Sequence, residues 1–328
     1  MRPLKLVPDN VNIDWMRWRH VATFFTLAMV IASIAMLGIR GLNFGIDFVG
    51  GQNIRVTFAQ PIEIDTLRER VDALGYGEST VQQFGSAQEV SIRMPVPGDD
   101  KDATARATAR VREVISKNYP GSQVASVEAV SGKVSGELFQ KGAMALGFAM
   151  LAVAIYIWFR FEWQFGVGAL LALAQDMLVT LGFFAATQLE FNLNTVAALL
   201  TIIGYSLNDK IVIFDRVREN LRKYRKMEIV PLLNLSINET LARTVMTSLT
   251  LITALAALVF LGPDVIFGFS LAMLLGIVVG TYSSMFVGNG ILIQFKVGPG
   301  SFKSDEEKAA EAKETAKATG QVNFKDMP

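Results

Sequence analysis

The chain contains no cysteine and only one histidine, His20. Disulfide bonds and cysteine nucleophiles are therefore excluded, and metal sites built from Cys and His ligands are nearly so. The chain also lacks the loop pattern G-x-x-x-x-G-K-[ST], which binds the phosphates of ATP. Any energy-coupled work must therefore draw on a source other than a nucleotide bound by this chain.

Charged residues are scarce as well. They make up 19% of the 328 residues, whereas hydrophobic residues make up 51%. Such a chain is too apolar for a soluble domain of this length, and we predict a membrane protein embedded in a lipid bilayer. The formal net charge of +1 gives no indication of a nucleic-acid partner.

Six long apolar stretches predict six transmembrane helices, because each approaches or exceeds the ~20 residues that a helix needs to cross a ~30 Å hydrocarbon core. No small-residue cleavage site closes the first stretch, so it is predicted to be an uncleaved anchor. The predicted spans are residues 21–39, 138–159, 164–187, 195–214, 241–261 and 267–295.

Basic residues predict the orientation of these spans. Arg17 and Arg19 precede the first span, and a basic run from Arg216 to Lys226 follows the fourth. The positive-inside rule places both segments in the cytoplasm. The predicted cytoplasmic parts are residues 1–20, 215–240 and 296–328. The last of these is poor in apolar residues and mixed in charge, so we expect a solvated helix or a disordered tail.

Residues 40–137 form a polar insert between the first two spans, and this orientation places the insert in the periplasm. Alternation of apolar and polar residues predicts four strands, and helical spacing predicts two helices. The predicted elements are strands 53–58, 79–84, 89–94 and 122–130 and helices 62–74 and 99–118. Their order, βαββαβ, is that of a small ferredoxin-like α+β domain. We therefore expect an α-helical polytopic membrane protein with one such domain.

Asp209 lies deep in the fourth predicted span, toward its cytoplasmic half. Thr201 and Tyr205 precede it at helical spacing and Asn208 lies beside it, so this stripe should face other helices. An ionisable residue inside a span costs ~2.5–3.5 kcal/mol even on lenient scales and usually marks a pathway or relay. The alternative is a structural ion pair, or a group that lies at the membrane interface.

The fifth span carries a comparable polar face, on which Glu239 and Arg243 lie. Because a cytoplasmic hairpin joins spans four and five, Asp209 and Arg243 can reach a similar depth from opposite directions. We therefore expect an acid and base pair inside the membrane, either as a relay or as a fixed structural pair.

Asp176 is as deeply placed in the third span, without a basic residue nearby in its own helix. We expect Asp176 either to be protonated and to stabilise helix packing through hydrogen bonds, or to belong to the same relay. The structural role is the favoured interpretation. Lys210 points about 100° away from Asp209 around the helix. We expect its ammonium group to extend toward the inner interface of the membrane.

The sixth span holds a small residue at every fourth position. This stripe predicts close packing against another helix rather than a cofactor groove. The predicted packing positions are Gly276, Gly280, Ser284 and Gly288.

Four ordered motifs resemble those of the SecF family, the smaller membrane subunits of the SecD/SecF complexes of the bacterial Sec translocase. They are "GIDFVGG" at residues 45–51, "IGYSLNDKIVIFDRVREN" in span four, "NETLARTVMTS" opening span five and "GIVVGTYSS" in span six. The resemblance covers nearly the whole chain. It implies a bacterial inner-membrane relative of the proton-driven RND transporters.

The resemblance implies that the chain pairs with SecD and uses the proton motive force to help draw unfolded preprotein out of the Sec channel, SecY/SecE/SecG. It implies no enzymatic activity and no cofactor, with protons as the coupling ion. The implied relay residues are Asp209 and Arg243, with a further aspartate from SecD. Asp176, Asn208 and Glu239 are weaker candidates. The segment containing Gly45, Asp47, Gly50 and Gly51 is predicted to be a joint, because its glycines permit backbone angles that other residues resist, the alternative being a plain turn before the first strand.

Two positions depart from the pattern of the family. Lys210 stands where threonine or serine is common, and Gln175 stands where histidine is common before Asp176. The second departure removes a titratable partner and weakens a relay role for Asp176. Two other functions stay open: a non-conducting structural subunit of the translocase, and a fragment of a small-molecule RND exporter. The single modest insert and the absence of a second six-span half argue against the exporter.

Overall fold

The computed structural model describes residues 8, 11–84, 86–95 and 101–298. Most of the predicted tail, residues 296–328, and part of the predicted N-terminal segment, residues 1–20, lie outside these ranges. The predictions for the tail therefore stay predictions.

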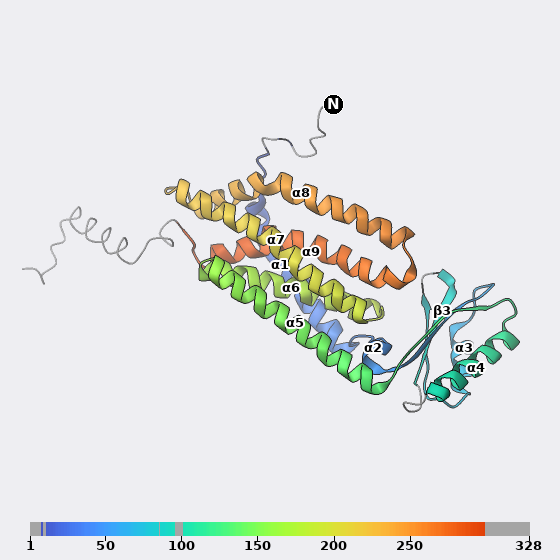
Figure 1. Cartoon of the computed structure of the whole chain (residues 1–328). Coiled ribbons are helices and arrows are strands. Elements are labelled where there is room, and N and C mark those ends of the chain that lie inside the picture. Colours follow the sequence, from blue (N-terminus) through green and yellow to red (C-terminus); the bar gives the residue numbers. More distant parts are fainter. Residues whose placement is uncertain (1–7, 9–10, 85, 96–100, 299–328) are drawn as a thin grey trace, which may run out of the picture.

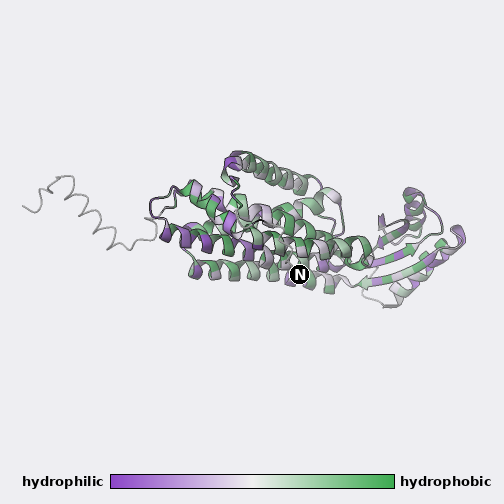
Figure 2. Ribbon diagram, turned by 90° about the horizontal axis from the view of Figure 1, so that it is seen from above, coloured by the Kyte–Doolittle hydropathy of each residue, from purple (hydrophilic) through white to green (hydrophobic). Residues whose placement is uncertain are grey.

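The described residues contain six helices long and apolar enough to cross a membrane, as the sequence predicts. They lie side by side in an elongated bundle, with hydrophobic residues along its length (Figures 1 and 2). The six helices are α1 (Arg19–Ile39), α5 (Gly132–Arg160), α6 (Trp163–Thr187), α7 (Leu193–Lys223), α8 (Ile229–Leu261) and α9 (Phe267–Gln294). Two short 3₁₀ helices, Trp15–Trp18 and Asp264–Ile266, precede α1 and α9.

Helices α6, α7 and α9 form the centre of the bundle. More than half of the residues in the most apolar part of each of these helices are buried, whereas in the other three helices the share is 6–17%. Apolar side chains such as Phe24, Phe148 and Phe260 are therefore left exposed on α1, α5 and α8. Such apolar side chains are suited to contact with lipid tails, which are as apolar as they are.

Helices α7 and α8 extend well beyond the predicted spans. Most of the predicted hairpin, residues 215–240, is helical, and only residues 224–228 connect the two helices. Polar contacts support these extensions, since the Asn220 amide donates to Glu239 Oε2 at 2.7 Å and to Ser236 Oγ at 3.0 Å. Hydropathy marks the part of a helix within hydrocarbon and gives no signal for a polar continuation.

The insert contains β1 (Gly51–Thr57), α3 (Ile64–Asp72), β2 (Thr80–Phe84), β3 (Ser86–Met94), α4 (Lys101–Asn118) and β4 (Gln123–Val130). The four strands form one antiparallel sheet in the order β2-β3-β1-β4. Both helices lie on the same side of the sheet (Figure 1). Leu67 and Val111, which are fully buried on these helices, pack with Ile54 and Ile92 of the strands to form the core.

The other face of the sheet is polar and contacts the bundle. Arg93 on β3 donates from Nη1 to the Phe44 carbonyl at 2.7 Å and from Nη2 to Asn43 Oδ1 at 2.5 Å. Burial lowers the pKa of Arg93, and nearby Glu190 opposes this effect. Burial also raises the pKa of Glu190, with Arg93 acting in the opposite direction. The sheet is therefore attached to the segment between α1 and α2 through hydrogen bonds from a partly desolvated arginine, with Glu190 of the α6–α7 loop nearby.

Candidate functional site

Asp209 lies on the inner side of α7 and is only 3% exposed. Its Oδ2 atom is buried without a hydrogen-bond partner among the described residues. An unpaired buried carboxylate oxygen is costly, so the group is poised to bind a proton or another donor. The structure thus places the principal candidate residue where the sequence predicts it, inside the helical bundle.

Arg243 on α8 lies within electrostatic reach of Asp209. The described part of the chain shows no ion pair between them, so the predicted close pair is not formed in this conformation. Arg243 is instead exposed on the surface of α8, and Asn208 is likewise exposed on α7. Glu239 accepts a 2.7 Å hydrogen bond from the Asn220 amide and forms a 3.7 Å ion pair with Arg216 near the hairpin.

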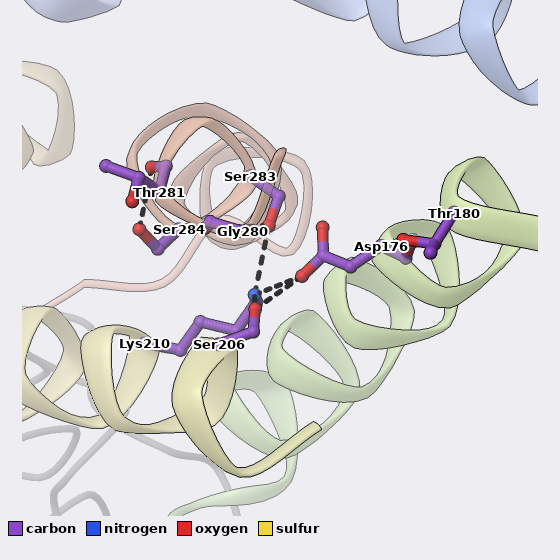
Figure 3. A network of polar contacts seen from close by, with 8 residues as sticks. All are labelled: Asp176, Thr180, Ser206, Lys210, Gly280, Thr281, Ser283 and Ser284. Carbon is purple, nitrogen blue, oxygen red and sulfur yellow. Dashed lines mark hydrogen bonds and ion pairs between the residues drawn. The ribbon is translucent and has the colours of Figure 1, made fainter. Parts of the chain in front are cut away.

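The prediction that Lys210 extends to the membrane interface is wrong. Its side chain is fully buried and its Nζ lies 2.8 Å from Asp176 Oδ2, which is also fully buried (Figure 3). Nζ also donates to Ser206 Oγ at 2.5 Å and to Ser283 Oγ at 3.0 Å. The face of α7 that carries Lys210 packs against α6 and α9, so the ammonium group is enclosed between helices.

The two departures from the family pattern, Lys210 and Gln175, both lie next to Asp176. Lys210 forms an ion pair with Asp176, and Gln175 directly precedes it on α6. Gln175 is 6% exposed, and both polar atoms of its amide are buried without a partner among the described residues. Asp176 is therefore an ion-paired carboxylate in this conformation, and the basic partner missing from its own helix comes from α7. Two opposite charges in different spans are a sequence signal for such a pair, since each would be costly alone.

A second polar chain, which was not predicted from the sequence, crosses the bundle. Tyr205 on α7 shares a 3.0 Å hydrogen bond with Ser248 on α8, and Ser248 shares one of 2.9 Å with Thr281 on α9. These hydroxyl groups have no charge, so their cost within a span is small and they give little signal in a sequence. They link α8 to the two central helices beside Asp209.

The small residues of α9 lie against α7. A Cβ atom on Gly276 would overlap the Ile202 side chain, and one on Gly280 would lie 2.9 Å from Ser206 Oγ. A Cβ atom on Gly288 would lie 3.0 Å from the ring of Phe214, and Ser284 is fully buried. The close approach of α7 and α9 brings Ser283 to Lys210, whereas Ser206 lies one turn before Lys210 on α7 itself.

The segment before the sheet is ordered by specific contacts. It contains the one-turn helix α2 (Ile46–Val49), which was not predicted from the sequence. Asp47 Oδ2 accepts a 2.9 Å hydrogen bond from the Leu193 backbone N–H at the start of α7, and the Gly45 N–H donates to the Phe191 carbonyl at 2.9 Å. Gly50 and Gly51 then adopt φ values of 75° and 111°, which strongly favour glycine. The segment therefore leads directly into β1 and is hydrogen-bonded to the first residue of α7.

Within the ranges that the structure describes, no group of three or more His, Cys, Asp or Glu side chains is placed to hold a metal ion. The chemistry of the site is that of carboxylate, guanidinium, ammonium and hydroxyl groups. These groups can accept, donate and redistribute protons and charge.

The chain is similar in sequence to known membrane proteins of protein export. A family model described as "Protein export membrane protein SecD/SecF, C-terminal" matches residues 110–298, and one described as "SecD/SecF GG Motif" matches residues 35–62. The chain is 42% identical over 294 residues to the protein translocase subunit SecF of Rickettsia rickettsii (strain Sheila Smith), which covers 89% of this chain and 95% of that protein. The chain belongs to the SecD/SecF family.

Other SecD/SecF relatives agree. The SecF subunit of Desulfurispirillum indicum is 44% identical over 289 residues, covering 87% of this chain and 92% of that protein. The crystal structure of SecDF from Thermus thermophilus, described as a translocon-associated membrane protein, matches with a TM-score of 0.81 and 34% identity. A SecDF structure in a "super-membrane-facing form" matches with a TM-score of 0.63 and 32% identity.

The two solved SecDF chains are longer than this one. The match covers 90% and 96% of this chain but only 40% and 41% of those chains. The chain thus corresponds to a SecF subunit of the SecD/SecF protein translocase. Six apolar helices and these relatives together identify an inner-membrane protein.

Proposed function

We propose that this chain is the SecF-like subunit that uses the proton motive force to assist preprotein passage through the Sec channel, SecY/SecE/SecG. It works with SecD as a translocation subunit rather than as an enzyme, and it uses protons as the coupling ion without a cofactor. The observation that carries the proposal is Asp209, a carboxylate buried in a span with one unpaired oxygen among the described residues. Because the chain is a SecF subunit, we assign proton binding to that carboxylate.

The sheet domain is ferredoxin-like and lies in the periplasm, with both chain termini in the cytoplasm. The order of its elements and of its strands, β2-β3-β1-β4, supports the first statement. Basic side chains such as Arg216 and Arg222 lie on the part of α7 that leads into the hairpin, whereas the first residue of α7 contacts the segment before the sheet. The positive-inside rule then supports a cytoplasmic hairpin.

Proton binding at Asp209 depends on Arg243. Low dielectric disfavours the ionised carboxylate, whereas a nearby guanidinium group favours it. Arg243 is exposed, and the described residues show no ion pair between it and Asp209, so a shift of α8 can change their separation without breaking such a pair. Approach of Arg243 would release the proton and withdrawal would allow Asp209 to bind another.

SecD covers the polar surface of α7 and α8. Thr201 and Asn208 on α7 and Arg243 and Thr250 on α8 are exposed within the spans. Exposure of Arg243 to lipid would be costly, and its neighbours leave a polar face unsuited to hydrocarbon. A membrane partner with a carboxylate opposite Arg243 would satisfy this face, as the aspartate that the family pattern assigns to SecD would.

Helix α7 transmits the effect of proton binding to the periplasmic domain. Asp47 binds the first residue of α7, and only Gly50 separates α2 from β1. A shift of α7 would therefore move the start of the sheet, which could retain the emerging polypeptide in a ratchet. A solved relative described as a "super-membrane-facing form" of SecDF supports the existence of more than one arrangement.

The energy available is sufficient for this task. Each elementary charge that crosses the membrane supplies about 2.3 kcal/mol per 100 mV. A few kcal/mol can change the ratio of two conformations by tens to hundreds of times, although it cannot unfold a domain. The proposal therefore requires only a reorientation of pre-existing rigid parts.

The test is preprotein export in vesicles that contain this chain, SecD and the Sec channel, with and without a proton gradient. We expect Asp209→Asn to abolish the gradient-dependent fraction of export and to leave ATP-driven export and complex abundance unchanged. Asp215→Asn is the matched control, because Asp215 is a carboxylate of the same helix that pairs with Arg160 at 2.7 Å near the helix end. Unchanged export in Asp209→Asn would leave the chain as a structural subunit.

A further inference from the structure

The ammonium group of Lys210 lies between α6, α7 and α9, surrounded by oxygen atoms from all three helices (Figure 3). Its three N–H groups have three acceptors, Asp176 Oδ2, Ser206 Oγ and Ser283 Oγ, at 2.5–3.0 Å. Lys210, Asp176, Ser206 and Ser283 are all fully buried. We call these four residues the cation cage.

The hydroxyl groups of the cage are oriented to present lone pairs to the ammonium group. Ser206 donates its own proton to Asp176 Oδ2 at 2.5 Å, and Ser283 donates its proton to the Gly280 carbonyl at 3.1 Å. Their remaining lone pairs are therefore free to face Nζ. Asp176 Oδ1 is a further buried oxygen without a hydrogen-bond partner among the described residues.

This donor set is the kind that a small hard cation binds. Carboxylate and hydroxyl oxygens with no nitrogen or sulfur ligand suit cations that prefer oxygen. The cage also draws its oxygens from separate helices, and the lack of a side chain at Gly280 lets α7 approach α9 closely enough to complete it. Lys210 occupies the position at which such an ion would lie.

We propose that Lys210 is a tethered cation that fills a monovalent-cation site formed by Asp176, Ser206 and Ser283 and so excludes Na⁺ and K⁺ from the core of the bundle. The charge of Asp176 is then balanced by the chain itself at any salt composition. This inference does not depend on whether Asp209 carries a proton.

A cation cage and a simple structural ion pair respond differently to removal of the lysine. Loss of one member of a buried pair leaves an uncompensated charge, which is strongly destabilising. In a simple pair nothing from solution can replace the lost partner. In a cation cage, a small ion can enter the vacated space and restore both the charge balance and the oxygen contacts.

The test measures the thermal unfolding of the full chain in lipid nanodiscs, in NaCl, KCl or N-methylglucamine chloride at equal concentration and a fixed scan rate. Lys210→Ala empties the cage, and we expect Na⁺ or K⁺ to raise its unfolding temperature by several degrees, in a concentration-dependent way, relative to N-methylglucamine. The unmodified chain should unfold at the same temperature in all three salts.

Two control variants separate the cage from general salt effects. Lys210→Met retains most of the side-chain volume and places a methyl group where the ammonium lay, so we expect no preference between the cations. Lys210→Ala with Asp176→Asn removes the charge that holds the ion and should also lose the preference. Both variants share the helix position and the lost lysine with Lys210→Ala.

Three results would overturn the proposal. The first is equal unfolding of Lys210→Ala in all three salts. The second is the same cation preference in Lys210→Met or in the double variant. The third is failure of Lys210→Ala to fold in any salt while Lys210→Met folds, because added Na⁺ or K⁺ should compensate for the missing ammonium.

Discussion

Glu190 is the residue whose surroundings give the clearest dependence on pH outside the membrane spans. It is half-buried between α6 and α7, near Arg93 of the sheet, and burial raises its pKa. The folded chain therefore holds this proton more tightly than the unfolded chain does. Stability from this group is complete below the ordinary glutamate pKa of about 4.3 and is lost as the pH rises through the raised folded value.

We expect Glu190→Gln to remove this part of the pH dependence, because glutamine stays neutral throughout. The unfolding temperature, measured below the ordinary glutamate pKa and above the raised pKa of Glu190, should fall less steeply with rising pH in Glu190→Gln than in the unmodified chain. Glu113→Gln, a change at an exposed carboxylate on α4, should leave the slope unaltered. Parallel slopes in all three proteins would show that Glu190 is as well solvated when folded as when unfolded.

Single residues show what could and could not be predicted about the site. Asp209 is identified from cost alone, since a carboxylate in an apolar span requires an explanation. The direction of Lys210 was predicted wrongly, because helical geometry gives its angle from Asp209 but not whether lipid or another helix lies there. Its partner Asp176 is in another span, and only tertiary packing brings the two together.

At the scale of the element, α9 tests the packing of the central helices. Gly276→Ala adds a Cβ atom that would overlap Ile202 of α7. We expect it to lower stability by about 1–3 kcal/mol through overpacking, despite the ~1 kcal/mol by which alanine favours a helix. Gly290→Ala is the control on the same helix, because no atom lies within 4 Å of its added Cβ. The unfolding temperature should fall only for Gly276→Ala. An equal fall in Gly276→Ala and Gly290→Ala would contradict the close packing of α9 against α7.

The existence of the helices was predictable but their extent was not. Six apolar runs correctly indicated six membrane helices, whereas α7 and α8 continue into polar sequence, where Asn220 donates hydrogen bonds to Ser236 and Glu239. These bonds join residues of different helices, so local pattern does not reveal them. The short helix α2 was missed for a related reason, since its contacts with Phe191 and Leu193 come from a distant loop.

At the scale of the whole molecule, the order of elements in the sheet domain was predictable from the sequence, but its attachment to the bundle was not. Alternation of side chains along β3 puts Arg93 on the face opposite Ile92, which packs in the core. It gave no reason for a polar face to be buried. The reason is the loop beneath it, where Asn43 and the Phe44 carbonyl accept both hydrogen bonds from Arg93.

This attachment sets how firmly the sheet domain is held. Arg93→Gln removes the charge and cannot reproduce both contacts, and hydrogen bonds from charged groups contribute about 1.5–3 kcal/mol each. We expect the domain to sample a wider range of orientations, seen as a broader distribution of distances between spin labels on Lys117→Cys in α4 and Thr187→Cys at the end of α6. The chain has no native cysteine, so the two labels are unambiguous.

Arg112→Gln is the matched control, because Arg112 is exposed on α4 and faces away from the core of the domain. Its distance distribution should equal that of the labelled chain without a further change. Arg93 and Glu190 also counteract the effect of burial on each other's pKa. We therefore expect a rise in pH to broaden the distance distribution of the labelled parent less than the substitution Arg93→Gln does. If Arg93→Gln leaves the distribution unchanged, the ring contacts of Phe44 and Phe48 with Phe139 of α5 are sufficient to hold the domain, and proton-driven reorientation must act on those contacts instead.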